Sequence, residues 1–457
     1  MYKADSEKML KKKITFFGLV AIFVGLNIGG ALFSLTNLAA DITGPSLPLA
    51  MLIASIPVVL ALVPYSMFSS AWPTTSATYR YSQLLSPPLA FIHMLTLLLS
   101  ITIGGQPLFA YTFGQYFKEL VPFPPVWTGV IVFTLFYIVN LLGIKFTTIL
   151  QIFLFLILMG ALIMFFGTGI SHVRAVNFSP LFPNGIGKFL AASGILFTFC
   201  AGGLFVIDVG GEVIDGSKRY KSALLSSMII VVVIYLLLHL VTVGSVPWDT
   251  LKEQGTLIVV ARSFMGQGPL TFFIIGGALI ACATTINIIF TIISRGLMVV
   301  SAEGLLPAFL GKVNKRFGTP HWGLTITYIG CTAALLILTS PIARGLADDP
   351  VLLFGAMTNF GLILSITVIC IAGARVPAKN DLLYQRSRYR ISKKTVAVIS
   401  WITVGMNSII FLLLVLLVKK AAMIFFILIA ISVIFYFIRI KFLKKRGIDI
   451  PGIPIIE

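Results

Sequence analysis

Charged residues are scarce in this sequence, and their scarcity limits what the protein can be. Only 11% of the 457 residues are Asp, Glu, Lys or Arg, whereas 58% are hydrophobic and the mean hydropathy is +1.03. Water-soluble proteins of this size do not reach such values, so we expect an integral membrane protein. The net charge of +19 comes from short basic clusters between apolar runs. We interpret these clusters as topology signals and expect no nucleic-acid partner.

Cysteine is also rare. The four cysteines lie within apolar segments, and none has the spacing of a metal site (Cys200, Cys282, Cys331 and Cys370). We therefore expect neither disulfides nor zinc, and no cofactor beyond a coupling ion. The sequence has no His-Glu-x-x-His motif and no paired carboxylates in an apolar run. These absences argue against a membrane-embedded protease, and we do not expect an enzyme.

Long apolar runs are what the sequence has in abundance. A helix needs about 20 apolar residues to cross about 30 Å of hydrocarbon. The first run follows three lysines but is about twice as long as a signal-peptide core, so it should remain as a helix. We predict twelve membrane-spanning helices, at residues 14–39, 46–69, 89–115, 126–144, 147–170, 187–213, 222–246, 270–300, 323–343, 351–373, 395–418 and 421–441.

The basic residues predict the orientation of these helices. Twelve spans place both termini on the same side of the membrane, and that side collects 26 of the 34 Lys and Arg residues. By the positive-inside rule, both termini should be cytoplasmic. We expect a multi-pass protein of the cell membrane, surrounded by lipid, whose oligomeric state the sequence does not determine.

Helices 1 and 6 each contain adjacent glycines, in "GLNIGGALF" at 25–33 and "CAGGLFVID" at 200–208. Glycine costs a helix interior about 1 kcal/mol relative to alanine. If the chain consists of two five-helix halves of opposite orientation, helix 6 is the counterpart of helix 1. Matching interruptions in two such halves indicate the binding site of a transporter. The alternative is that the glycines only allow close helix packing.

Broken helices can hold a zwitterion without charged side chains. Unwound backbone in the membrane must line a polar cavity or be buried in protein. A half-helix that begins after the break offers N–H groups to a carboxylate, and one that ends before it offers carbonyls to an ammonium group. Helix 1 has no charged residue between Lys13 and Asp41. This arrangement favours a carrier over a channel.

Five stretches also resemble, in order, the motifs of the amino acid, polyamine and organocation permease superfamily. They cover about residues 14–375. The first looks like the Ile-Gly-x-Gly-Ile-Phe signature of helix 1, and the second is similar to a Pro-x-x-Gly-Gly-x-Tyr-x-Tyr stretch followed by Leu-Gly-Pro. The third resembles the link between helices 4 and 5, the fourth the exit of helix 6, and the last helix 8 with its Asp-Gly-Leu-Leu-Pro-type end. The stretches are "NIGGALF" (27–33), "PTTSATYRYSQLLSPPLAF" (73–91), "NLLGIKFTTILQ" (140–151), "EVIDGSKRYKSAL" (212–224) and "TINIIFTIISRGLMVVSAEGLLP" (285–307).

The sequence departs from the family pattern at several of its glycines and prolines. The second signature glycine is alanine here, and alanine still permits close backbone approach. The departures are Ala31, Ser76, Ala77, Ser86, Gly216 and Lys221.

The resemblance implies the leucine-transporter fold, an all-α membrane protein that moves amino acids or related amines by alternating access. It implies two inverted repeats, at residues 14–170 (helices 1–5) and 187–373 (helices 6–10), with helices 1 and 6 broken at mid-membrane. Helices 11 and 12 follow at 395–441. Cytoplasmic tails are expected at 1–13 and 442–457.

Resemblance and physical argument point to the same substrate site. The N–H groups of Ile28, Gly29, Gly30 and Ala31 should hold a carboxylate. Carbonyls at Asn27 and at Phe199, Cys200 and Ala201 should accept an ammonium group. Gly202 matches the family's helix 6 glycine, and Gly203, Leu204 and Phe205 complete the site. Leu204 stands where relatives with cationic substrates can carry an acidic residue, so we expect a neutral, apolar amino acid.

Two carboxylates near the inner end of helix 6 need separate interpretation. Asp208 lies one turn beyond Leu204, and an intramembrane carboxylate is a functional candidate by default. It could neutralise a substrate amine, carry a proton, or pair structurally near the cytoplasmic end. Glu212 is interpreted as a cytoplasmic pairing residue, with Arg80 or Arg295 as its partner.

The coupling ion is predicted from helices 5 and 8. Many relatives carry a lysine in helix 5 whose ammonium group replaces a sodium ion, but this chain has Leu158 there. Ala281, Thr284 and Thr285 share one face of helix 8. With the carbonyls of Gly25 and Ile28 they would provide five neutral oxygens for Na⁺, as in sodium-coupled members of the fold. The alternatives are threonines bonded to their own helix, proton coupling and uncoupled exchange.

Overall fold

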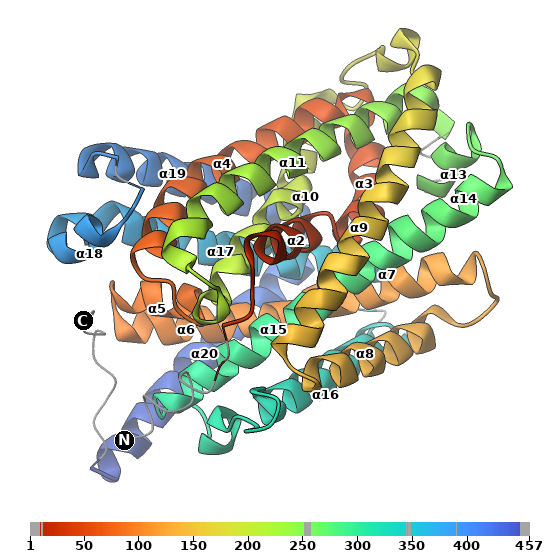
Figure 1. Ribbon diagram of the computed structural model, residues 1–457. Coiled ribbons are helices and arrows are strands. Elements are labelled where there is room, and N and C mark those ends of the chain that lie inside the picture. Colours follow the sequence, from red (N-terminus) through yellow and green to blue (C-terminus); the bar gives the residue numbers. More distant parts are fainter. Residues whose placement is uncertain are drawn as a thin grey trace.

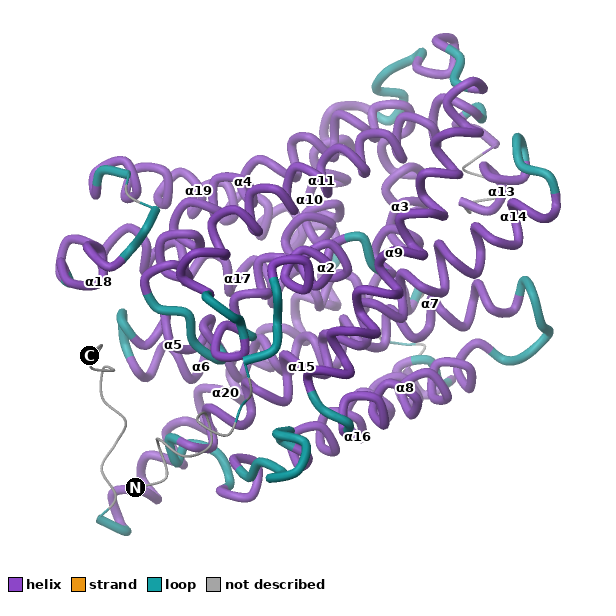
Figure 2. Tube along the Cα trace, viewed as in Figure 1, coloured by secondary structure: helices purple, strands orange, loops and turns teal. Residues whose placement is uncertain are grey.

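The computed structural model describes residue 10 and residues 12–250, 257–343, 345, 349–389 and 391–447. Most of the predicted tails, 1–13 and 442–457, lie outside the described residues. Within these ranges the regular structure is helical, with a few isolated β-bridges. Figures 1 and 2 show the long helices lying side by side in one bundle.

The first half of the chain forms helices that begin and end close to the predicted spans. They are α2 (Phe16–Asn27), α3 (Gly30–Thr43), η1 (Gly44–Ser46), α4 (Leu47–Ala71), α5 (Ala77–Gln83), α6 (Pro87–Ser100), η2 (Ile101–Gly105), α7 (Gln106–Lys118), α8 (Pro125–Leu141), α9 (Ile144–Gly169), η3 (Ile170–His172) and η4 (Ala175–Phe178).

The second half follows the same pattern. Its elements are α10 (Gly185–Ala201), η5 (Gly202–Asp208), η6 (Gly210–Glu212), α11 (Gly216–Ser245), α13 (Leu257–Arg262), α14 (Gln267–Phe272), η7 (Phe273–Leu279), α15 (Ile280–Ala302), η8 (Ala308–Gly311), α16 (His321–Leu338), η9 (Pro341–Ala343) and α17 (Pro350–Lys379). The chain ends with α18 (Asp381–Arg386), α19 (Lys393–Leu417) and α20 (Lys419–Lys445).

Ten helical stretches among the described residues are long and apolar enough to cross a membrane. The first, Phe16–Ala71, contains two of the predicted spans, and the shorter apolar helix α8 coincides with another. Each predicted span therefore overlaps a helix. The prediction of an all-helical, multi-pass membrane protein is confirmed at this level.

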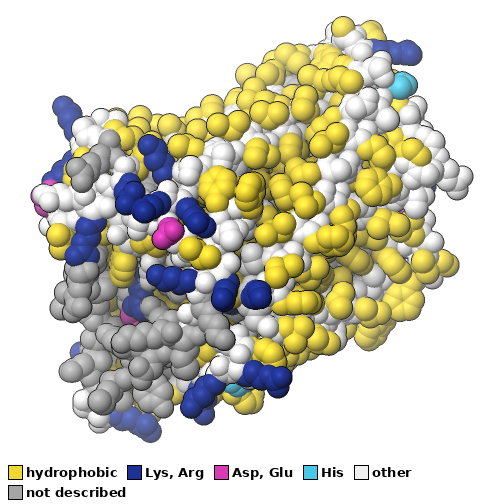
Figure 3. Space-filling model, in the orientation of Figure 1, with side chains coloured by type: hydrophobic (Ala, Val, Ile, Leu, Met, Phe, Trp, Pro, Cys, Tyr) yellow, Lys and Arg dark blue, Asp and Glu magenta, His cyan; other side chains and the backbone are white. Residues whose placement is uncertain are grey.

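The surface is divided into an apolar flank and a basic end. Figure 3 shows hydrophobic side chains over much of the visible flank, whereas Lys and Arg gather at the end where α5 and α18 lie. Large apolar side chains such as Leu156, Ile163 and Ile229 are more than 60% exposed. Lipid is the environment in which such exposure carries no penalty.

The first helix lies inside the bundle and not at its lipid-facing surface. All residues of α2 from Gly18 to Asn27 are buried. The helix packs against α9, α11, α15 and the 3₁₀ segment η5, and Figure 1 shows it surrounded by other helices. A break in this helix is therefore covered by protein, which is the condition under which irregular backbone is stable at membrane depth.

Irregular segments interrupt helices in both halves of the chain. The third predicted span contains a π-helical segment, η2, with the sequence "ITIGG", and the eighth contains another, η7, with the sequence "FIIGGAL". Helices 1 and 6 are both interrupted as well, although differently. α2 and α3 are separated at Ile28 and Gly29, while α10 passes directly into the tighter 3₁₀ turn of η5.

Candidate functional site

The break in helix 1 is made by Gly29, where the chain leaves α2 and enters α3. This glycine has extended backbone angles (φ −98°, ψ −154°) and precedes the first residue of α3, Gly30. A Cβ on Gly29 would lie 1.6 Å from the Thr285 hydroxyl oxygen, so a larger residue does not fit. The first N–H groups of α3, at Gly30 and Ala31, have no acceptor within the helix. They provide the positive helix end that binds anions.

Helices 1 and 6 meet at the glycine pair of helix 6. A Cβ on Gly202 would lie 2.7 Å from the Leu26 carbonyl oxygen, and one on Gly203 would lie 2.3 Å from Asn27 Nδ2. The Gly203 N–H donates to Asn27 Oδ1 at 2.6 Å. The two interruptions predicted from sequence are thus in direct contact. Sequence reasoning did not show that helix 6 continues as a 3₁₀ turn.

Tyr235 of α11 is a contact of this site that the sequence analysis missed. Its hydroxyl donates to the carbonyl oxygen of Asn27 at the end of α2. Its ring lies 4.8 Å from that of Phe199, centroid to centroid. Asn27 is fully buried, and its Nδ2 has no hydrogen-bond partner among the described residues. A buried donor without a partner is costly, so this nitrogen is available to a bound molecule.

A small pocket of about 40 Å³ lies beside the contact between helices 1 and 6. Its three threonines turn their hydroxyls away from the space. Thr198 donates to Asn359 Oδ1, Thr285 to the Gly25 carbonyl and Thr358 to the Phe354 carbonyl. Methyl groups and apolar side chains therefore face the pocket, which suits an apolar group. The lining residues are Leu26, Ile101, Phe109, Thr198, Gly202, Phe205, Thr285, Ile289, Ile292, Thr358 and Leu362.

The residues predicted to bind a cation also come together. Thr284 Oγ1 lies 2.7 Å from the Ala281 carbonyl oxygen and 3.4 Å from that of Gly25. Thr285 Oγ1 lies 3.0 Å from the Gly25 oxygen and 3.1 Å from the Ala281 oxygen. Both hydroxyls thus bond to their own helix and also reach α2. The oxygens of Gly25, Ala281, Thr284 and Thr285, four of the five predicted ligands, therefore form one buried group. The group lies near the end of α2, the helix that Ile28 caps.

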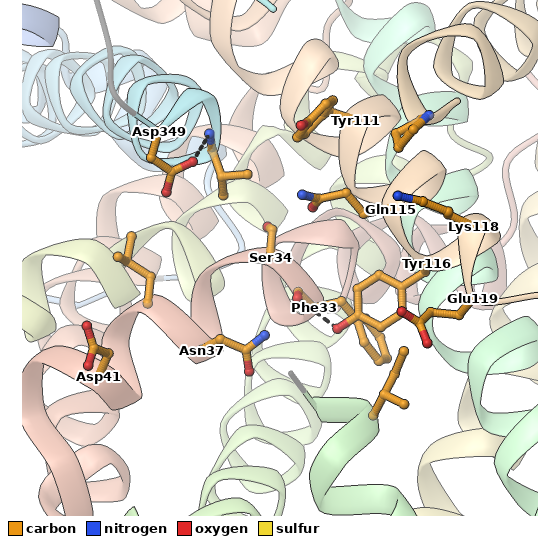
Figure 4. A pocket seen from close by; sticks show the side chains of 14 residues that line it. Phe33, Ser34, Asn37, Asp41, Tyr111, Gln115, Tyr116, Lys118, Glu119 and Asp349 are labelled. Carbon is orange, nitrogen blue, oxygen red and sulfur yellow. Dashed lines mark hydrogen bonds between the residues drawn. The ribbon is translucent and has the colours of Figure 1, made fainter. Parts of the chain in front are cut away.

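A wide cavity of about 610 Å³ opens beyond α3 on one side of the bundle. Figure 4 shows Asp41, Glu119 and Asp349 around it, together with Lys118. Tyr116 donates to the Phe33 carbonyl at 3.1 Å, and the two rings lie 5.5 Å apart. Phe33 follows the break by one turn, so this aromatic pair lies between the cavity and the interrupted part of helix 1.

The other end of helix 6 is closed by a buried ion pair. Arg295 of α15 binds both carboxylate oxygens of Glu212, with an Nη2 to Oε2 distance of 3.1 Å. The side chains are 2% and 0% exposed. The N–H groups of Lys13 and Ile14 donate to the Glu212 carbonyl at 2.9 and 3.0 Å. Of the two partners considered for Glu212, Arg295 is the one observed.

Arg80 instead pairs with Glu303, at the loop after α15. The same carboxylate accepts from the Tyr79 hydroxyl and from Gln83 Nε2, each at 2.6 Å. Burial, together with the neighbouring Glu303 charge, raises the pKa of the Tyr79 phenol well above its ordinary value, so the phenol remains a donor. These contacts tie α5 to α15 next to the Glu212–Arg295 pair.

Asp208 caps the short helix α5. Its two carboxylate oxygens accept from the Thr78 N–H at 2.7 Å and from the Thr78 hydroxyl at 2.9 Å. The Ser76 N–H donates to the Asp208 carbonyl at 2.8 Å. Of the three roles considered for Asp208, these bonds support structural pairing.

Comparisons with known proteins identify the family of this chain. Residues 14–419 match the family described as amino acid permease. The chain is 27% identical over 392 residues to a methylthioribose transporter of Bacillus subtilis (strain 168), covering 80% of this chain and 82% of the relative. It is 22% identical over 391 residues to the branched-chain amino acid permease BcaP of the same organism, covering 80% and 81%. An aspartate-proton symporter of that organism is 25% identical over 346 residues, covering 70% and 66%.

Proposed function

The chain belongs to the amino acid permease family, and from this premise we propose that it is a secondary active transporter of a neutral amino acid with an apolar side chain. Transport occurs by alternating access and is driven by Na⁺. The chain crosses the cell membrane twelve times as two inverted five-helix repeats followed by two further helices. Both termini are cytoplasmic, on the side of the basic end of the surface.

The observation that carries the substrate class is the neutral, glycine-lined contact between the two interrupted helices. The N–H groups at the start of α3 suit a carboxylate, and the Asn27 carbonyl at the end of α2, which accepts from Tyr235, keeps a second lone pair that suits an ammonium group. The adjoining pocket presents the methyl groups of Thr198, Thr285 and Thr358. It accommodates an aliphatic side chain and leaves a charged one without a partner.

The repeated irregularities support the inverted repeats. Helices 1 and 6 are interrupted, and helices 3 and 8 each contain a π-helical segment. Members of each pair stand five helices apart, which is the spacing that two inverted five-helix units require.

The proposed Na⁺ site consists of the Gly25, Ile28 and Ala281 carbonyls and the hydroxyls of Thr284 and Thr285. A hard cation prefers such neutral oxygens, and an ion bound between α2 and α15 stabilises the turn that precedes the break. Substrate then bridges helices 1 and 6, the outer path closes, and the Glu212–Arg295 side opens. Coupling requires only that ion and substrate favour the same state.

One alternative substrate, which is also uncharged, follows from the family relatives. A methylthioribose transporter is 27% identical to this chain, and the neutral, apolar pocket could also receive a methylthio group. An H⁺-coupled or uncoupled exchanger of amino acids or amines is the other alternative, and one relative is named an aspartate-proton symporter.

Uptake into proteoliposomes separates these functions. We expect saturable uptake of labelled aliphatic amino acids under an inward Na⁺ gradient, and exchange against the same amino acid inside. Aspartate, lysine and methylthioribose should not compete. If methylthioribose competes and amino acids do not, the substrate is methylthioribose and not an amino acid. If uptake is driven by a pH gradient and does not depend on Na⁺, coupling is to H⁺ and not to Na⁺.

Removing both hydroxyls of the ion site should weaken the response to Na⁺. The Thr284→Ala, Thr285→Ala variant loses two of five oxygens, and we expect its half-saturating Na⁺ concentration to rise by at least about tenfold, the equivalent of about 1.4 kcal/mol. Flux at saturating substrate, measured against Na⁺ concentration, checks this. The matched control is Thr325→Ala in α16, whose hydroxyl bonds to His321 of its own helix and to Tyr137. Wild-type Na⁺ dependence in the double variant contradicts the site.

A further inference from the structure

A chain of buried side chains leads from α8 to the turn of α2 that contains Gly25. The Thr291 hydroxyl donates to Asn140 Oδ1 at 2.7 Å, and Asn140 Nδ2 donates to Asn287 Oδ1 at 3.1 Å. Asn287 Nδ2 donates to Gln151 Oε1 at 3.0 Å. All four side chains are at most 3% exposed. The proposed function uses none of these contacts.

Backbone carbonyls determine which way the amides point. Asn140 Nδ2 also faces the Phe136 carbonyl at 2.9 Å, and Asn287 Nδ2 faces the Thr147 carbonyl at 3.3 Å. A carbonyl only accepts, so each of these amide atoms is the nitrogen. Gln151 must then present its oxygen to Asn287 and its nitrogen to α2.

The Gln151 amide nitrogen packs directly on the proposed ion site. It lies 3.5 Å from the Ala21 carbonyl oxygen, and a Cβ on Gly25 would lie only 2.2 Å from it. The same Cβ would lie 3.5 Å from the Thr284 hydroxyl. Two partly positive amide hydrogens are therefore held beside the residue whose carbonyl is a proposed Na⁺ ligand.

We propose that Gln151 is a positioning residue that weakens cation binding at the Gly25 turn, and that the Asn140–Asn287 relay holds it in that orientation. The inference rests on the proposed Na⁺ site and deepens it. A donor facing the ion site lowers the affinity for a cation and competes for the carbonyls of α2. The weaker affinity lets the ion leave after the substrate has crossed.

Two substitutions at this position test the orientation. Gln151→Met keeps an unbranched side chain but removes the donor. It should lower the half-saturating Na⁺ concentration by about threefold to tenfold, the range for one neutral hydrogen-bonding group. It should also lower the maximal transport rate, because release becomes slower. Gln151→Glu keeps the acceptor for Asn287 and places a negative charge toward α2, so Na⁺ should bind still more tightly.

The glutamate variant adds a pH readout that a merely structural role would not produce. When protonated, its carboxyl donates as the glutamine amide does, so weak Na⁺ binding should return as the pH is lowered. Among the described residues, the hydrogen-bond partners of Gln151 are neutral, namely the Ala21 carbonyl of α2 and the Asn287 amide of α15, and the glycine packed against its amide nitrogen is Gly25. The introduced carboxyl is therefore the titrating group, and wild type should lack this pH dependence.

The measurement is Na⁺ titration of purified protein in detergent, with choline chloride as the balancing salt and the thermal unfolding midpoint as the signal, followed by flux in proteoliposomes. Asn407→Leu is the control, because Asn407 is a buried amide in α19 that donates to Thr367. The inference is supported if Gln151→Glu binds Na⁺ more tightly than Gln151→Met does, and if Gln151→Met binds Na⁺ more tightly than the wild type does. If the wild type responds to Na⁺ and both variants bind Na⁺ with the same affinity as the wild type, the inference about Gln151 is wrong and the coupling proposal stands. If the wild type does not respond to Na⁺, the coupling proposal is wrong as well.

Discussion

Replacing Glu212 with glutamine should destabilise the protein by about 3–5 kcal/mol, the cost of leaving a buried charge without its partner. Arg295 is 2% exposed and binds both oxygens of Glu212. Its remaining recorded contact is the Thr291 carbonyl at 3.3 Å, which cannot neutralise a guanidinium group. The thermal unfolding midpoint of the purified protein in detergent measures this loss.

A matched control and a double variant show that the loss comes from the unpaired charge. Glu119→Gln breaks the Arg262–Glu119 pair, whose side chains are 58% and 42% exposed, and should change stability by less than about 1 kcal/mol. The Glu212→Gln, Arg295→Met variant removes both charges and should recover much of the stability. An unchanged midpoint in the single variant, or no recovery in the double variant, would contradict a role for the buried pair in the fold.

Transport in the single variant should also change, because the pair lies at the end of helix 6 that opens in the proposed transport cycle. The Glu212 backbone carbonyl receives the N–H groups of Lys13 and Ile14, so the same residue holds the segment before α2. Glutamine keeps this backbone carbonyl but removes the charge pair that anchors it, which favours the proposed state that is open on this side. The substrate-free leak of Na⁺ in proteoliposomes should therefore increase.

The sequence predicted the parts of the fold that depend on local composition. Apolar runs of membrane length predicted the helices, because backbone groups in lipid can be satisfied in few other ways. The glycine pair in "GLNIGGALF" predicted the break between α2 and α3, since only glycine fits against Thr285. Glu212 was predicted to pair because a buried carboxylate needs a partner.

Other features could not be read from sequence because they depend on how each helix is rotated. A helix buried on all sides, such as α2, has no polar face from which its orientation could be inferred. The contact of Tyr235 with Asn27 and the Asn140–Asn287–Gln151 relay therefore required the structure. The close approach of Leu26 and Gly202, where η5 begins, depends on the same rotations.

Gly202→Ala should reduce substrate affinity by about tenfold to hundredfold, because one added methyl group forces helices 1 and 6 apart. The new Cβ would lie 2.7 Å from the Leu26 carbonyl oxygen and 3.4 Å from its carbon. Both are backbone atoms that cannot move aside as a flexible side chain does, and overpacking of this kind costs about 1–3 kcal/mol. Substrate affinity measured by competition in proteoliposomes, together with maximal flux, checks the prediction.

Gly194→Ala in the same helix is the matched control for this effect. Its Cβ would lie 3.4 Å from Leu414, an ordinary contact, and alanine is favoured over glycine within a helix by about 1 kcal/mol. This variant should transport as the wild type does. If both variants bind and transport normally, the substrate does not lie where the two interrupted helices meet. If only Gly202→Ala fails, and its response to Na⁺ alone is retained, the glycine is required for the substrate site and not for the ion site one turn away.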